Sequence, residues 1–174
     1  GDARHAFAVF KVSGLSSNAL LEKVGQAMAG GASLSREDEE AWSRVQRRVR
    51  TLCEATAAAG GRVMVDAEES WIQDAIDALA EDMMSDYNRD RVVVYNTVQM
   101  YRHDRLAYLE AMADRAAEGG YLAGVKLVRG AYMEKERERA AQQGYPSPIQ
   151  PDKASSDRDF DAAVRWVLDR IACI

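Results

Sequence analysis

The sequence predicts an α/β protein in which about four strand–helix units form the first part of a TIM-type (βα)8 barrel. Four short runs rich in valine alternate with longer stretches of helical spacing, at intervals typical of βαβ units. The runs do not alternate with polar residues, which indicates parallel strands covered on both faces. A polar side chain stands near the end of each run, where a barrel would bring all four to one mouth. These side chains are Lys11, Asp66, Gln99 and Lys126.

The alternation of strands and helices also fits a doubly wound sheet. The polar strand ends favour the barrel, because a barrel collects such residues from several different strands. No strand is followed by the Gly-x-Gly-x-x-Gly turn of a dinucleotide-binding Rossmann domain, and this disfavours that alternative further.

The first unit contains an extra helix. A strand is expected at residues 6–12, followed by a helix that ends at Gly30-Gly31. A second helix begins near Ser35, with acidic residues in its first turn, and ends at Gly60-Gly61. Because no strand separates the two helices, we expect residues from about 32 to 60 to form a helical insertion between the first two strands.

The other three units follow in order, with strands expected at residues 62–66, 92–99 and 124–128. After the fourth strand, residues 133–143 predict one or two charged helical turns, and all three prolines lie in a loop at 144–151. A last helix is expected to be capped by Ser156 or Asp157. Its inward residues would be Phe160, Val164, Val167, Leu168 and Ile171.

Composition excludes several classes of function. The net charge of -5 leaves no basic stripe for nucleic acid, and no apolar run could span a bilayer. Two isolated cysteines and two isolated histidines lack metal-ligand spacing, so we expect reduced intracellular thiols and no metal site. We also expect that the chain was cut from a longer protein, since it begins with Gly1 and stops at Ile174 without a polar tail.

Two lysines, an aspartate and an amide at one mouth would suit an anionic substrate beside a polar cofactor. Three of these residues also have a plain structural alternative. Lys126 could extend out of the rim, Asp66 could cap the helix that follows it, and Gln99 could simply be the first polar residue beyond its strand. The residue pattern alone therefore predicts half of a (βα)8 enzyme barrel.

Several segments at these positions resemble the proline dehydrogenase family. They occur in the family's order along the chain, at residues 10–14, 66–69, 95–101 and 126–132. Residues 144–150 look like the monofunctional branch found in some bacteria and in mitochondria. The resemblance implies a distorted barrel that binds FAD. It also implies oxidation of L-proline to Δ1-pyrroline-5-carboxylate by hydride transfer to the flavin, with electrons passed to a membrane quinone.

The resemblance also implies a role for each polar residue. Lys11 would pair with the proline carboxylate, and Asp66 would belong to the polar network of the active site. Gln99 would contact the edge of the flavin ring, and Lys126 would stand beside flavin N5, where some relatives carry arginine. Lys11, Asp66 and Lys126 are thus expected to be catalytic. The cofactor-binding residues would be Asp66, Gln99, Lys126, Val128, Gly130, Ala131, Tyr132 and Met133, the last where some members carry tryptophan.

The chain departs from the family in size, because the family needs eight strands and this sequence supplies four. The remaining half of the barrel, with paired arginines for the substrate carboxylate, is therefore an expected partner, and the chain alone is expected to be inactive. Two alternatives stay open: a 4-hydroxyproline dehydrogenase, and a non-catalytic half barrel without tight FAD binding. The expected location is cytoplasmic, or peripheral on an inner membrane through other parts of the protein, on the matrix side in a eukaryote.

Overall fold

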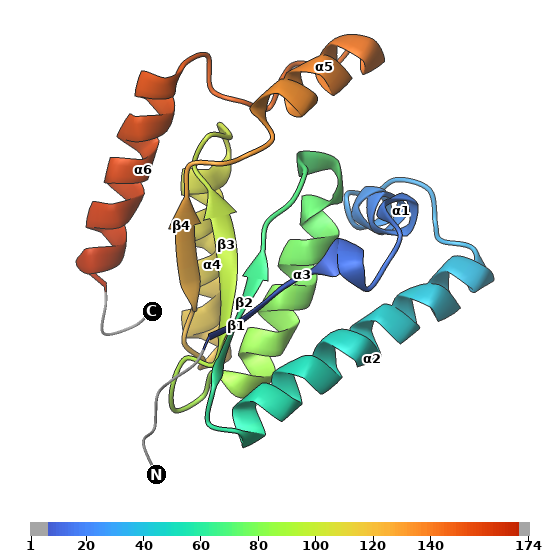
Figure 1. The fold of residues 1–174 in the computed structure, drawn as a ribbon, viewed down its shortest axis with the longest axis vertical. Helices are drawn as coiled ribbons and strands as arrows, with labels where there is room; N and C mark the ends of the chain where they lie inside the picture. Colours follow the sequence, from blue (N-terminus) through green and yellow to red (C-terminus); the bar gives the residue numbers. More distant parts are fainter. Residues whose placement is uncertain (1–6, 171–174) are drawn as a thin grey trace.

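The structure is a computed structural model that describes residues 7–170, and its strands form one parallel sheet in chain order (Figure 1). The strands are β1 (Phe7–Lys11), β2 (Arg62–Asp66), β3 (Val94–Gln99) and β4 (Val125–Val128). An order without reversal is that of consecutive barrel units, whereas a doubly wound sheet reverses at its switch point. The expected α/β fold is therefore confirmed. Ala6, expected in the first strand, lies outside the described residues, as do His5, Ile171 and Cys173.

Helices follow every strand, and two of them lie between β1 and β2. They are α1 (Asn18–Met28), α2 (Arg36–Ala58), α3 (Ser70–Tyr87), α4 (Arg105–Gly119), α5 (Met133–Gln143) and α6 (Lys153–Leu168), with a short 3-10 turn at Val12–Gly14. The long helix α2 occupies most of the expected insertion. It begins after Ser35, whose hydroxyl accepts a hydrogen bond from the Asp38 amide at 3.1 Å.

The last two helices differ from the prediction. Helix α5 is an 11-residue helix rather than one or two turns. Helix α6 begins before Ser156, because the Asp152 carboxylate accepts from the Ser155 amide at 2.7 Å and caps the helix. These hydrogen bonds hold the pKa of Asp152 below its usual value.

The inward face of α6 is only partly the expected one. Ala163 is fully buried, and Phe160, Val164 and Val167 are partly buried. Leu168 was expected inside but its side chain is 60% exposed. It follows Ala163 by five residues, which turns it roughly 140° around the helix from the buried side.

The two faces of the sheet have different surroundings. Val63, Val65 and Val94 on the outer face are buried against α3, where they join Ile72 and Ile76 in the core. The inner face is open, and its first strand exposes 45% of Phe7 and 54% of Val9. These apolar side chains belong to the face that forms the interior of a closed barrel.

Cys53 lies on α2 and is part of the hydrophobic core, where its thiol is fully buried. Burial raises its pKa to about 12, so almost no thiolate exists at pH 8. We expect the native protein to resist alkylation at Cys53, and the unfolded protein to react readily. Mass spectrometry of the Cys53 peptide measures the extent of alkylation. Rapid labelling of the folded chain would show that the packing around Cys53 on α2 is open to solvent.

Candidate functional site

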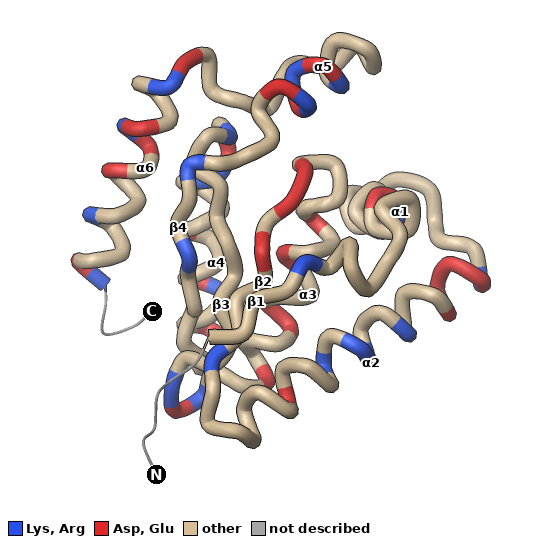
Figure 2. Tube along the Cα trace, in the orientation of Figure 1, with Lys and Arg blue, Asp and Glu red and all other residues tan. Residues whose placement is uncertain are grey.

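The carboxyl ends of the strands open into a hollow of about 440 Å³. A basic segment lies at the carboxyl end of β1 and another on β4, and an acidic segment lies at the end of β2 (Figure 2). The hollow contains every site residue predicted from the sequence except Met133, which begins α5 and does not line it. Its lining consists of Lys11, Asp66, Ala67, Thr97, Gln99, Lys126, Leu127, Val128, Arg129, Gly130, Ala131, Tyr132 and Phe160.

Strand register explains why the charged residues meet. Lys11 pairs with Asp66 across β1 and β2, and Thr97 pairs with Lys126 across β3 and β4. Val65 pairs with Asn96, which brings the next residues, Asp66 and Thr97, to the same level. Residues paired in register point to the same face, so these side chains form one row across the inner face.

Asp66 holds the two lysines of this row. Its Oδ1 lies 2.6 Å from Lys126 Nζ, and its Oδ2 lies 3.9 Å from Lys11 Nζ. The Asp66 carboxylate does not cap α3, whose cap position is Glu69. Because one carboxylate balances only one of two ammonium groups, the row keeps a net positive charge that favours an anionic ligand.

Tyr132 connects the two edges of the sheet. Its hydroxyl accepts a hydrogen bond from Lys11 Nζ at 3.0 Å, although the residues are 121 positions apart. This hydrogen bond raises the pKa of Lys11 and fixes the position of its ammonium group. The segment after β4 thus closes one side of the hollow over β1.

Gln99 is almost completely buried, with 3% of its surface exposed. Its Nε2 donates to the Glu68 carbonyl oxygen at 2.7 Å. Its Oε1 accepts no hydrogen bond from the described residues, and this atom is not enclosed by the surrounding protein. The amide oxygen therefore faces the hollow.

Glu68 and Glu69 immediately precede α3, with Glu69 at its N-cap position, but the Glu69 side chain forms no capping hydrogen bond. The described α3 has no acidic residue in its first turn. Glu68 instead accepts hydrogen bonds from the amide and hydroxyl of Ser13, and Glu69 pairs with Lys135. Sequence reasoning missed these contacts because they join distant segments of the chain.

The start of α3 is capped by a residue from α5. Glu136 is fully buried, and its carboxylate accepts from the Ser70 amide and the Ser70 hydroxyl, both at 2.6 Å. A carboxylate at a helix N-terminus is stabilised by the macrodipole. This contact holds α5 above the strand ends, beside the hollow.

The wall along β4 is built from small and apolar residues, and Gly130 is essential to it. Its φ is +132°, and a Cβ added there would lie 2.4 Å from the ring of Tyr101. Gly130→Ala should therefore destabilise the fold by about 1–3 kcal/mol, measured by urea unfolding. Gly14→Ala is the matched control, since a Cβ there meets nothing within 4 Å. Equal stability of both variants would show that Tyr101 does not pack on Gly130.

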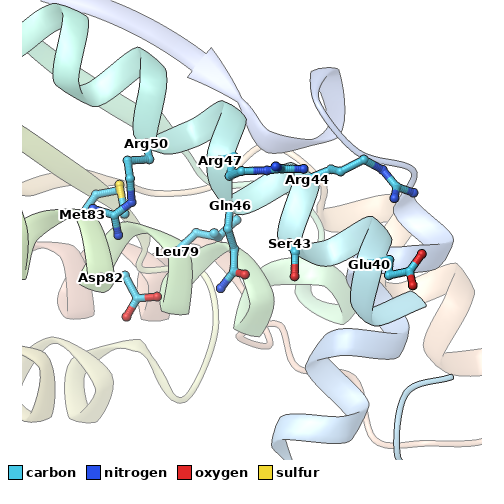
Figure 3. A pocket seen from close by; sticks show the side chains of 9 residues that line it. All are labelled: Glu40, Ser43, Arg44, Gln46, Arg47, Arg50, Leu79, Asp82 and Met83. Carbon is cyan, nitrogen blue, oxygen red and sulfur yellow. The ribbon is translucent and has the colours of Figure 1, made fainter. Parts of the chain in front are cut away.

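A second hollow of about 550 Å³ lies between α2 and α3 (Figure 3). Arginines of α2 dominate it, and Arg50 is paired with Asp86 at 2.5 Å. Arg44, Arg47 and Arg48 are exposed, as expected of a solvated helix face. This groove lies on the outer layer, away from the strand ends, so the mouth of the sheet is the better candidate site.

Two further observations concern residues 7–170. No group of three or more histidine, cysteine, aspartate or glutamate side chains in this range is placed to hold a metal ion. Within the same range, the helices are too short or too polar to cross a membrane.

Comparison with known proteins places these features in one family. A family model described as "Proline dehydrogenase" matches residues 5–174. The carbapenem antibiotics biosynthesis protein CarD of Pectobacterium carotovorum subsp. carotovorum is 38% identical over 169 residues, covering 95% of this chain and 43% of that protein. Mitochondrial proline dehydrogenase 1 of Drosophila melanogaster is 36% identical over 135 residues, or 78% of this chain and 20% of that protein.

A solved structure has a similar fold. Proline utilization A from Bdellovibrio bacteriovorus, inactivated by N-propargylglycine, aligns with a TM-score of 0.80 at 20% identity, over 95% of this chain and 16% of that one. The hydroxyproline dehydrogenase of Xenopus laevis is 38% identical over 125 residues, or 72% of this chain and 27% of that protein. The chain spans less than half the length of each of these proteins.

Proposed function

The chain belongs to the proline dehydrogenase family, and from this premise we propose that it forms one wall of an FAD-dependent L-proline dehydrogenase site. The reaction would convert L-proline and a quinone to Δ1-pyrroline-5-carboxylate and a quinol. The observation that carries the proposal is the row of Lys11, Asp66 and Lys126 beside the amide of Gln99, all in one hollow at the strand ends.

The residues of the hollow fit a flavin ring. Val128, Gly130 and Ala131 supply a wall of small side chains, which suits a flat apolar ring. Gln99 turns an amide oxygen, and Lys126 a cation, toward the same space, which suits the polar edge of the ring. FAD, when bound, would supply the acceptor for the hydride that leaves proline.

The chain's own residues would bind and orient. Lys11, held in place by its hydrogen bond to Tyr132, would bind the carboxylate of proline. Lys126 would place positive charge where negative charge develops during the reaction. Asp66 would keep both ammonium groups in position and limit their mutual repulsion.

We propose that four further βα units complete the barrel. The open inner face of the sheet and the greater length of the relatives support this. The missing half would carry the paired arginines and the contacts with a membrane quinone. The 174-residue chain alone should therefore turn over no proline. A yellow, dimeric preparation would mean that two copies rebuilt a barrel.

The experiment is to purify the full-length protein and record its flavin absorbance before and after anaerobic addition of L-proline. We expect a yellow protein that is bleached by proline and that turns over with a quinone analogue. Absence of both flavin and proline turnover would refute the proposal.

Oxidation of 4-hydroxyproline is the second candidate, favoured by the similarity to a hydroxyproline dehydrogenase. The two substrates differ by one hydroxyl, and the residues that would recognise this hydroxyl are expected in the half of the barrel outside this chain. Measuring kcat/KM for both substrates on the same preparation decides between them. A higher kcat/KM for 4-hydroxyproline would make 4-hydroxyproline, and not proline, the substrate.

A further inference from the structure

Behind the hollow, a chain of buried hydrogen bonds begins at Gln99. The Glu68 carbonyl that accepts from Gln99 belongs to a residue whose own amide N–H donates to Gln73 Oε1, at 2.9 Å. Gln73 Nε2 in turn donates to Asp77 Oδ1 at 2.8 Å. Gln73 is 1% exposed and Asp77 is 5% exposed, so water does not compete for these bonds.

Asp77 is the fixed end of this chain. Its Oδ2 accepts from Arg105 Nη1 at 2.8 Å, and its Oδ1 also accepts from Asn96 Nδ2 at 2.8 Å. Arg105 is itself 5% exposed and is a donor only. A carboxylate paired with a guanidinium can only accept, so the group of Gln73 that faces it must be the amide nitrogen.

This end orients the Gln73 amide. With its nitrogen on Asp77, Gln73 has only its oxygen for the Glu68 N–H, and this bond restrains the backbone at Glu68. The carbonyl of Glu68 lies in the next peptide plane, and its position depends on that restrained backbone. It accepts from Gln99 Nε2, which leaves Gln99 Oε1 facing the hollow.

We propose that Gln73 and Asp77 are positioning residues for the cofactor site, which act through Glu68 to make Gln99 present an acceptor oxygen. The ligand edge that meets Gln99 would therefore carry an N–H donor. This inference rests on the proposed function for the identity of the ligand, and it assigns a role to buried residues that touch neither cofactor nor substrate.

The test uses Gln73→Met, which keeps the size of the side chain but removes both ends of its hydrogen bonding. Tyr108→Phe is the matched control, because the Tyr108 hydroxyl bonds Asn96 and Glu81 on the far side of Asp77. In the ¹H–¹⁵N spectrum of the cofactor-free chain, the Gln99 side-chain amide pair is assigned by its loss in Gln99→Ala. We expect Gln73→Met to move this pair toward the position of exposed glutamines, and Tyr108→Phe to leave it unchanged.

Gln73→Glu provides a second variant and a rescue. Its protonated carboxyl supplies one donor and one acceptor, enough for the bonds that the amide makes to Asp77 and Glu68, so the Gln99 pair should keep its position at acidic pH. Raising the pH removes the donor to Asp77 and should then displace the pair. The proposal would be overturned if the Gln99 amide signals did not move in Gln73→Met, or if they did not move with pH in Gln73→Glu.

FAD affinity provides the second readout, in the full-length protein. Gln73→Met should raise the FAD dissociation constant about tenfold, the cost of one lost hydrogen bond in a dry site. Once Gln99→Ala is present, Gln73→Met should have no further effect. Additive losses would contradict the positioning role. Should the unsubstituted protein bind no FAD, the proposed function fails, while the spectra of the cofactor-free chain still decide whether Gln73 positions Gln99.

Discussion

Lys126→Met in the full-length protein should lower kcat for proline oxidation by about 100-fold, the effect of removing one charge-stabilising group from an enzyme site. Lys126 Nζ is held by Asp66 at 2.6 Å, and Lys126 lines the hollow from β4 itself. Methionine preserves most of the length of the side chain. The measurement is the rate of flavin reduction by proline in single-turnover experiments, which separates chemistry from quinone turnover.

Lys135→Met is the control for this prediction. Lys135 is also a lysine paired with a carboxylate, that of Glu69, but it lies on α5 outside the hollow. Its replacement should change the rate of flavin reduction little. Equal losses for both variants, or no loss for Lys126→Met, would mean that Lys126 does not stabilise the reaction.

Asp77→Ala should lower the free energy of unfolding by about 3–5 kcal/mol, because it leaves the Arg105 guanidinium buried without its partner. The two side chains are 7% and 6% exposed and lie 2.8 Å apart. The loss also removes acceptors for Gln73 and Asn96. Urea unfolding of the chain, followed by circular dichroism, measures the change.

Glu40→Ala provides the comparison for Asp77→Ala. Glu40 pairs with Arg36 on α2, but both side chains are largely exposed, so solvent screens the interaction. This variant should unfold at nearly the same urea concentration as the parent. A small effect of Asp77→Ala would contradict the view that its ion pair with Arg105 anchors α3 to α4.

The sequence was sufficient to predict the strands and the residues at their ends. Valine-rich runs and glycine boundaries place strands reliably, and the polar residues at their ends then share one mouth by topology. Lys11, Asp66, Gln99 and Lys126 were predicted in this way, and all four line the hollow. Local capping was less reliable, since Asp152 rather than Ser156 begins α6.

The buried polar network was not predicted, although the sequence contains a signal for it. Asn96 lies on the same face of its strand as Val94 and Val98, where a polar side chain needs a partner. Gln73 and Asp77 are spaced by four residues on a helix, which places them on one side. What the sequence does not reveal is that these three residues meet, because their contacts depend on how α3 packs against β3.

The capping of α3 by Glu136 was missed for a related reason. Glu136 lies in a run of charged residues that is indistinguishable from a solvated helix, and its partner Ser70 precedes it by 66 positions. Only the placement of α5 over the strand ends shows that this carboxylate is buried. Contacts between distant segments thus set the details of the site, while local patterns set its location.

A crystal structure of the full-length protein with FAD tests the central claim most directly. We expect the flavin ring to lie along Val128–Ala131, within hydrogen-bond distance of Gln99 Oε1 and beside Lys126 Nζ. A flavin bound elsewhere, or one that contacts neither Gln99 nor Lys126, would contradict the assignment of this hollow as the cofactor site.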